Sequence, residues 1–297
     1  MDQTFTCALL LLSLSAAFGK YVYIEQRMTW HEAQSYCRMF YTDLATVSNK
    51  HDIRQLWRLA GDSRDFFWIG MKRSSTDNKK WMWSGGGEVS TFFWAPSQPD
   101  NRPHEDYGVI RHYMWHDSQA FYRLPFFCYS VVVVRVRKTW EEALQYCREH
   151  HHDLASAVSE AEMLLIQKEL EKTVTAEHVW IGLRFLPGRW VWVDGRPLHY
   201  EAWGQENKPA CPDVSLKCAA LQVRAGTQSN STVLPLFTHA SDTVGTGPDH
   251  TDDTASVVDT PANTGLDISG VSQAAAGVNR HVWEAHNCEE RLHFICY

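Results

Sequence analysis

The stretch between residues 98 and 117 carries the side chains of this sequence that are best suited to binding chemistry. It contains three short motifs, Gln98-Pro99-Asp100-Asn101, Glu105-Asp106 and Trp115-His116-Asp117. Calcium in proteins takes six to eight oxygen ligands from carboxylates, amides, carbonyls and water. Oxygens of this kind are supplied by Gln98, Asp100, Glu105 and Asp117. A cis peptide bond before Pro99 would turn the flanking side chains toward one side, so the sequence predicts a calcium site.

An internal repeat supplies the elements that must position this loop. The segment Thr29–Cys37 reads TWHEAQSYC, and 110 residues later Thr139–Cys147 reads TWEEALQYC. Each copy places Glu three residues after Thr, which is the capping box of a helix N-terminus. Each then spaces Trp, Ala and Cys three and four residues apart, on one face of that helix. A repeat of this length predicts two similar domains.

Further matches extend the repeat along the chain. Trp68-Ile69-Gly70 corresponds to Trp180-Ile181-Gly182, Trp81-Met82-Trp83 to Trp190-Val191-Trp192, Trp94 to Trp203, and Phe126–Tyr129 to Phe294–Tyr297. With these motifs the sequence resembles two tandem C-type lectin-like domains, of the secreted, fish type. The resemblance implies an α+β fold in which each domain has two helices, small antiparallel sheets and a long loop region. It is more specific for the fold than for the function.

The loop motifs are similar to the sugar-binding calcium site of that family, in which two sugar hydroxyls complete the ion's shell. The resemblance implies one set of ligands for both calcium and sugar, and a galactose-type preference from Gln-Pro-Asp. That set is Gln98, Asp100, Glu105 and Asp117. Two features depart from the family. His116 stands where the family has Asn, and imidazole suits a hard cation poorly. The inner disulfide is missing, with Tyr107 and Ala120 at its expected positions. The alternative interpretation is a degenerate, solvated loop.

The second copy keeps fewer of these ligands. Its loop reads Gln205-Glu206-Asn207 without the proline, and Trp283-Glu284-Ala285 replaces the family's Trp-Asn-Asp. We therefore expect no calcium-dependent sugar site in the second domain. A separate run, His150–His152, could hold a transition metal, but its place at a helix end favours a solvated surface that complements the helix dipole.

Eight cysteines indicate an oxidising compartment. Residues 1–19 form an apolar leader, which predicts a signal peptide that removes Cys7 and is too short to span a bilayer. The resemblance implies three disulfides, Cys37–Cys128, Cys147–Cys296 and Cys218–Cys288. Cys211 is left over, and an odd cysteine predicts either a free thiol or a bridge between subunits.

The repeat also predicts the domain boundaries. We expect the first domain at residues 20–129 and the second at 130–297, joined without a flexible linker. The second contains an extra segment at about 224–280, which has no Trp, Tyr or Cys. Such a composition predicts a disordered insertion, and a retained intron is the other interpretation. The segment holds the sequon at Asn230, a predicted glycosylation site.

The composition and motifs narrow the function classes. A formal net charge of -7 argues against nucleic-acid binding. No nucleophile, base and orienting group stand at an informative spacing, so we expect no enzyme. The sequence predicts a secreted, extracellular carbohydrate-binding lectin that does not span a membrane, with calcium-dependent, galactose-type binding through the first domain. Association through Cys211 as a homo-oligomer would raise its avidity for glycans. The alternative is a calcium-independent scaffold with degenerate sugar sites that binds a cell-surface protein.

Overall fold

The computed structural model describes residues 19–61, 63–173, 177–204, 208–210, 212–213, 215–223 and 282–297. Several sequence predictions fall on residues outside these ranges. They are the signal peptide apart from Gly19, the segment 224–280, Asn230, Cys211 and Gln205–Asn207.

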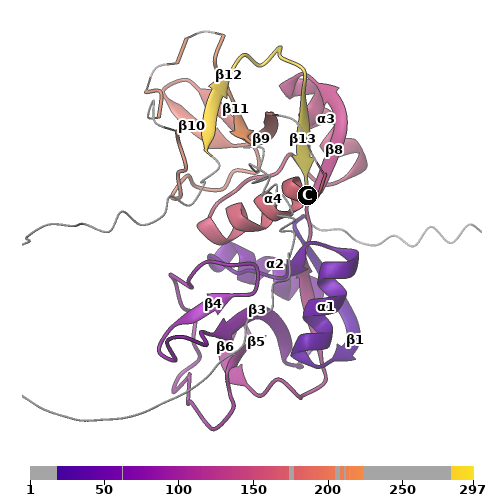
Figure 1. Ribbon diagram of the computed structural model, residues 1–297, viewed down its shortest axis with the longest axis vertical. Coiled ribbons are helices and arrows are strands. Elements are labelled where there is room, and N and C mark those ends of the chain that lie inside the picture. The colour runs from indigo at the N-terminus through magenta and orange to yellow at the C-terminus, as the bar shows by residue number, and fades with distance from the viewer. Residues whose placement is uncertain are drawn as a thin grey trace, which may run out of the picture. The chain divides into compact units, whose positions relative to one another are not determined.

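The described part of the first repeat consists of two helices and seven strands (Figure 1). In chain order they are β1 (Tyr21–Met28), α1 (Trp30–Phe40), β2 (Asp43–Leu44), α2 (Lys50–Ala60), β3 (Phe67–Arg73), β4 (Trp81–Trp83), β5 (Tyr107–Arg111), β6 (Met114–Ser118) and β7 (Leu124–Tyr129). The sheet runs β1-β7-β3-β5-β6, with β2 on β7 and β4 on β3. Pairing of β1 with β7 brings the two ends of the repeat together.

The second repeat follows the same order. Its described elements are β8 (Val132–Lys138), α3 (Trp140–His150), α4 (Glu160–Thr173), β9 (His178–Leu186), β10 (Arg189–Trp192), β11 (Cys218–Gln222), β12 (Trp283–His286) and β13 (Leu292–Cys296). The sheet runs β12-β11-β9-β13-β8, with β10 on β9. The predicted α+β class, with two helices in each repeat, is confirmed. Each sheet is antiparallel except for one parallel pair, β3 with β7 and β13 with β9.

The repeated helix starts form as the sequence predicts. The Thr29 hydroxyl accepts a hydrogen bond from the Glu32 N–H, and the Glu32 carboxylate accepts one from the Thr29 N–H. Thr139 begins α3 in the same way. The apolar face of α1, formed by Trp30, Ala33 and Cys37, is buried. This packing fixes each helix against its own sheet, because the buried stripe has the helical period.

A tight hairpin joins β5 to β6 in the first repeat. β5 ends at Arg111 and β6 begins at Met114. His112 and Tyr113 have φ angles of 46° and 67° and form the turn, since Arg111 pairs with Met114. Positive φ at both central residues gives a two-residue hairpin whose twist matches its strands.

Three disulfide bonds join cysteines of the described ranges. They are Cys37–Cys128, Cys147–Cys296 and Cys218–Cys288, with Cα separations of 5.4, 5.4 and 5.2 Å. In the first repeat Tyr107 lies opposite Ser118, as Cys218 lies opposite His286. Tyr107 therefore occupies the position of the third bridge. Its ring packs against Trp30 at a centroid distance of 4.8 Å instead.

A buried cluster of charges connects α2 with α4. Lys20 Nζ lies 2.8 Å from Asp52 Oδ1 and also bonds the Glu162 carboxylate. Arg196 Nη1 lies 3.9 Å from each of these two carboxylates. Burial raises the pKa of the Glu162 carboxyl, while Lys20 and Arg196 oppose that rise. Arg196 Nε also bonds Asp194 Oδ2 at 2.5 Å, so two cations lie among three carboxylates. Such pairing is the condition under which charges remain buried.

Candidate functional site

Three carboxylates of the predicted calcium set converge in the first repeat. Asp100, Glu105 and Asp117 each offer one oxygen, and these oxygens lie within 4.8 Å of one another. Asp100 is exposed, Glu105 is half-buried and Asp117 is buried. Carboxylates in such proximity repel one another unless a proton or a cation lies between them. The arrangement therefore suits a divalent cation that prefers oxygen ligands.

Asp117 organises the loop around this group. It lies on β6, and its carboxylate accepts hydrogen bonds from the N–H groups of Asp100 (3.1 Å) and Asn101 (2.9 Å). The peptide bond between Gln98 and Pro99 is cis. Gln98 Oε1 accepts a hydrogen bond from the Asp117 N–H at 3.4 Å. The fourth predicted ligand thus lies beside the other three, although its oxygen already contacts the backbone of β6.

A hydrogen bond between the two outer carboxylates shifts their pKa values in opposite directions. The hydrogen bond with Glu105 lowers the pKa of Asp100. Burial, followed by the hydrogen bond with Asp100, raises the pKa of Glu105. Glu105 thus holds a proton to a higher pH than an ordinary glutamate. A cation at this position would relieve the repulsion between the two groups.

Two arginines reduce the negative charge of the group. Arg73 Nη2 lies 4.0 Å from Asp117 Oδ2, and the same guanidinium bonds the side chains of Asn101 and Asp106 at 2.8 Å. Arg102 Nε lies 3.0 Å from Asp100 Oδ2. The sequence analysis did not identify Arg73, because it comes from β3, far from the loop along the chain. A calcium ion would compete with both guanidinium groups for the same oxygens.

His116 lies outside the carboxylate group. Its ring packs edge-on against Phe66, with centroids 5.2 Å apart. Because neighbouring residues of a strand point to opposite faces, His116 and Asp117 project away from each other. Burial, with Arg111 second, lowers the pKa of His116, so its imidazole is neutral at pH 7. Histidine at position 116, where the family has asparagine, removes a ligand from the site and adds no competing cation.

The corresponding strand of the second repeat supplies fewer oxygen ligands for a cation. Trp283 pairs with Trp203 as Trp115 pairs with Trp94. Ala285 therefore takes the place of Asp117 and supplies no side-chain oxygen.

None of the helices among the described residues combines the length and the apolar character needed to cross a membrane.

A protein-family model described as the Lectin C-type domain matches residues 26–130 and 136–233. Human C-type mannose receptor 2 is 24% identical over 216 residues, which cover 60% of this chain and 14% of the receptor. Human E-selectin is 30% identical over 139 residues, covering 42% of this chain and 22% of the selectin. The chain thus spans less than a quarter of the length of either relative.

Solved structures give matches of the size of one repeat. Human lithostathine is 23% identical with a TM-score of 0.34, covering 37% of this chain and 81% of that one. The C-type lectin CEL-I from Cucumaria echinata is 26% identical with a TM-score of 0.33, covering 36% and 86%. The matched family is typically non-enzymatic, which confirms the prediction that the chain is not an enzyme.

Proposed function

The chain belongs to the Lectin C-type domain family, and from that membership we propose a secreted lectin that binds carbohydrate. The first domain binds a galactose-type sugar through a calcium ion. One observation carries this proposal, the convergence of Asp100, Glu105 and Asp117 within 4.8 Å. Relatives named as a mannose receptor and a selectin support binding to glycans.

The proposal includes the organisation of the chain. A signal peptide at residues 1–19 directs a fish-type protein to the extracellular space, and the domains span 20–129 and 130–297. The segment 224–280 is an insertion that carries a glycan on Asn230. Cys211 joins two copies into a homo-oligomer, which raises the avidity of weak sugar sites.

Each residue of the site has a distinct task. Asp117 holds the loop through two backbone N–H groups and turns its carboxylate toward the ion. Burial raises the pKa of Glu105, so protons compete with the ion for its carboxylate as the pH falls. Asp100 and Gln98 complete the protein's oxygens. The ion supplies coordination positions for two sugar hydroxyls, to which the carboxylates also offer hydrogen-bond acceptors.

The charges around the site determine how tightly it is expected to bind calcium. Arg73 and Arg102 lie within 4.0 Å of the carboxylates and offset part of their charge. Only four side chains supply oxygens, so water fills the rest of the shell. Extracellular calcium modules with few charged ligands bind at about 0.1–1 mM, and we expect this range here.

Calorimetric titration of the full chain with calcium tests the proposal. Glu105→Gln removes one ligand charge from a half-buried position, whereas Glu88→Gln removes one from an exposed ion pair with Lys80 outside the site. The proposal predicts one saturable site that Glu105→Gln abolishes and Glu88→Gln preserves. Folded protein that binds no calcium at millimolar concentration would contradict it.

A specific surface favours the second candidate function, a calcium-independent scaffold for a protein partner. A groove of about 570 Å³ lies beside α1, and Met39 and Phe40 on its wall are 74% and 61% exposed. Exposed apolar patches of this kind mark protein-binding surfaces. Met39→Ser with Phe40→Ser would remove partner binding and leave calcium binding intact if this candidate is correct.

A further inference from the structure

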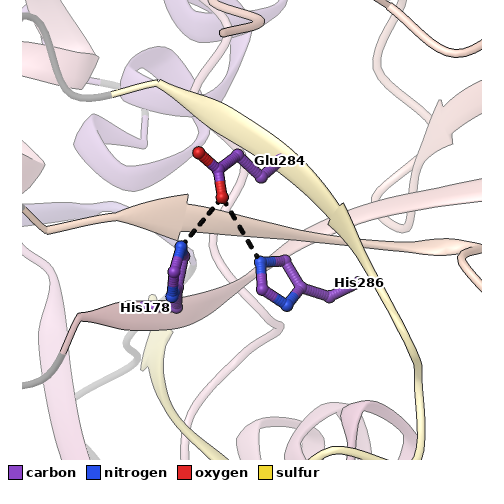
Figure 2. Close-up of side chains that lie close together, drawn as sticks. All are labelled: His178, Glu284 and His286. Atoms are coloured by element: carbon purple, nitrogen blue, oxygen red, sulfur yellow. Dashed lines mark hydrogen bonds and ion pairs between the residues drawn. The ribbon is translucent and has the colours of Figure 1, made fainter. Parts of the chain in front are cut away.

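A second group of metal-binding side chains lies in the second repeat. His178, Glu284 and His286 each offer one ligand atom, and these atoms lie within 4.8 Å of one another. His178 Nε2 is 2.9 Å and His286 Nε2 is 3.7 Å from the same atom, Glu284 Oε2. Figure 2 shows both imidazole rings directed at that one carboxylate oxygen. The group has no counterpart among the predicted site residues.

Two strands, β9 and β12, carry these side chains. His178 is the first residue of β9, and Glu284 and His286 alternate on β12, so the latter two project from one face. The strand between them is β11, which places Ala220 opposite Glu284. On its other side β11 places Gln222 opposite His178, so His178 and Glu284 meet diagonally across this strand.

The surroundings of the group fit a metal ligand set. The side chains of His178 and His286 are only 15% and 16% exposed, whereas Glu284 is 37% exposed. His286 Nδ1 lies 3.1 Å from Glu290 Oε2, which orients the ring and leaves Nε2 for an ion. Histidines that bind metals usually donate the other ring N–H to a carboxylate, a backbone carbonyl or water. The two glutamates together would balance a charge of +2.

The donor types and spacing fit a zinc ion. Two imidazoles and one carboxylate form a known zinc ligand set, whereas calcium prefers oxygen alone. Ligands at 2.0–2.1 Å from a tetrahedral zinc ion lie about 3.3–3.4 Å apart. The two measured separations, 2.9 and 3.7 Å, lie on either side of this value. We propose that His178, Glu284 and His286 bind a zinc ion, with the fourth position open to water.

The first repeat provides an internal comparison. Aligning Trp68 with Trp180 and Trp115 with Trp283 shows which residues stand at the equivalent positions. They are Phe66, His116 and Ser118. Phe66 and His116 pack together there as rings, and that repeat is folded without the zinc ligands. His178→Phe therefore installs a side chain that this fold already accommodates.

Zinc titration of the chelator-treated full chain against a chromophoric indicator tests the proposal. We expect one zinc per chain at this site, with affinity reduced about 100-fold in His178→Phe and about tenfold in Glu290→Gln. Replacing His150–His152 with asparagine, or Cys211 with serine, removes competing zinc ligands and should leave this affinity unchanged. Thermal unfolding checks that each variant is folded.

Two results would overturn the proposal. One is the absence of saturable zinc binding in the unmodified chain. The other is a site that survives His178→Phe, or that disappears when His150–His152 are replaced. Because zinc and calcium are titrated separately, neither result bears on the calcium site of the first repeat.

Discussion

Restoring the missing bridge of the first repeat is a direct test of the equivalence between the two copies. Tyr107 pairs with Ser118, and Cys218 pairs with His286, so Tyr107 and Ala120 occupy the positions of Cys218 and Cys288. In the second repeat these positions have a Cα separation of 5.2 Å. Tyr107→Cys with Ala120→Cys should therefore form a disulfide without movement of the backbone.

The gain in stability follows from the size of the closed loop. The bridge would span 13 residues, and the chain-entropy relation gives about 3 kcal/mol for that length. For a protein of this size that corresponds to a rise in Tm of roughly 6–12 °C. Replacing Tyr107 also removes its packing against Trp30 and its contact with His31 at 3.1 Å. The matched control is therefore Tyr107→Cys with Ala120→Ser, which loses the same ring but cannot form the bridge.

Thermal unfolding of the two variants isolates the effect of the bridge. Mass measurement after thiol blocking establishes that the disulfide has formed. The reasoning predicts that the bridged variant unfolds at the higher temperature and binds calcium more tightly, since Glu105 and Asp117 flank the new bridge. Failure of the two cysteines to join under oxidising conditions would refute the register equivalence. A bridge that forms without raising Tm would refute the entropic argument.

Three further predictions concern charges. Lys20→Met leaves Asp52 and Glu162 buried without their nearest cation, so we expect a loss of about 3–5 kcal/mol in the free energy of unfolding. The control Lys80→Met, at an exposed ion pair, should cost much less in the same thermal unfolding measurement. Because the pKa of Glu105 is raised, protons compete with calcium, and calcium affinity should fall as the pH falls through that pKa. Calorimetric titration with calcium at several pH values checks this, and an affinity that does not change with pH would contradict it. Arg102→Gln removes a cation 3.0 Å from Asp100, so calcium affinity should rise by up to about fivefold; an unchanged affinity would show that the guanidinium does not compete.

Local patterns of the sequence predicted the elements that depend on local chemistry. Thr29 with Glu32 and the spacing of Trp30, Ala33 and Cys37 were sufficient for α1, because caps and helical periods involve neighbouring residues. The sequence analysis identified no strand at β5, which is a short apolar run after a loop rich in proline and polar residues. Its hairpin turn places His112 and Tyr113 at positive φ, a backbone conformation that is uncommon for residues other than glycine.

In the candidate sites, too, the grouping of nearby residues was predictable and the contacts between distant strands were not. The grouping of Asp100, Glu105 and Asp117 was predictable because they lie close together in the sequence and resemble a family motif. The position of Arg73 beside Asp117 depends on pairing between distant strands. Glu284 was interpreted only as a lost calcium ligand. Its contact with His178, 106 residues away, requires the strand order of the folded sheet.

Retention of the full chain on immobilised galactose, with and without calcium, tests the central claim most directly. The account predicts retention in millimolar calcium, release by a chelator, and loss of retention in Glu105→Gln but not in Glu88→Gln. Retention that survives both the chelator and Glu105→Gln would contradict a calcium-dependent sugar site. So would the absence of retention by protein whose calcium site is saturated.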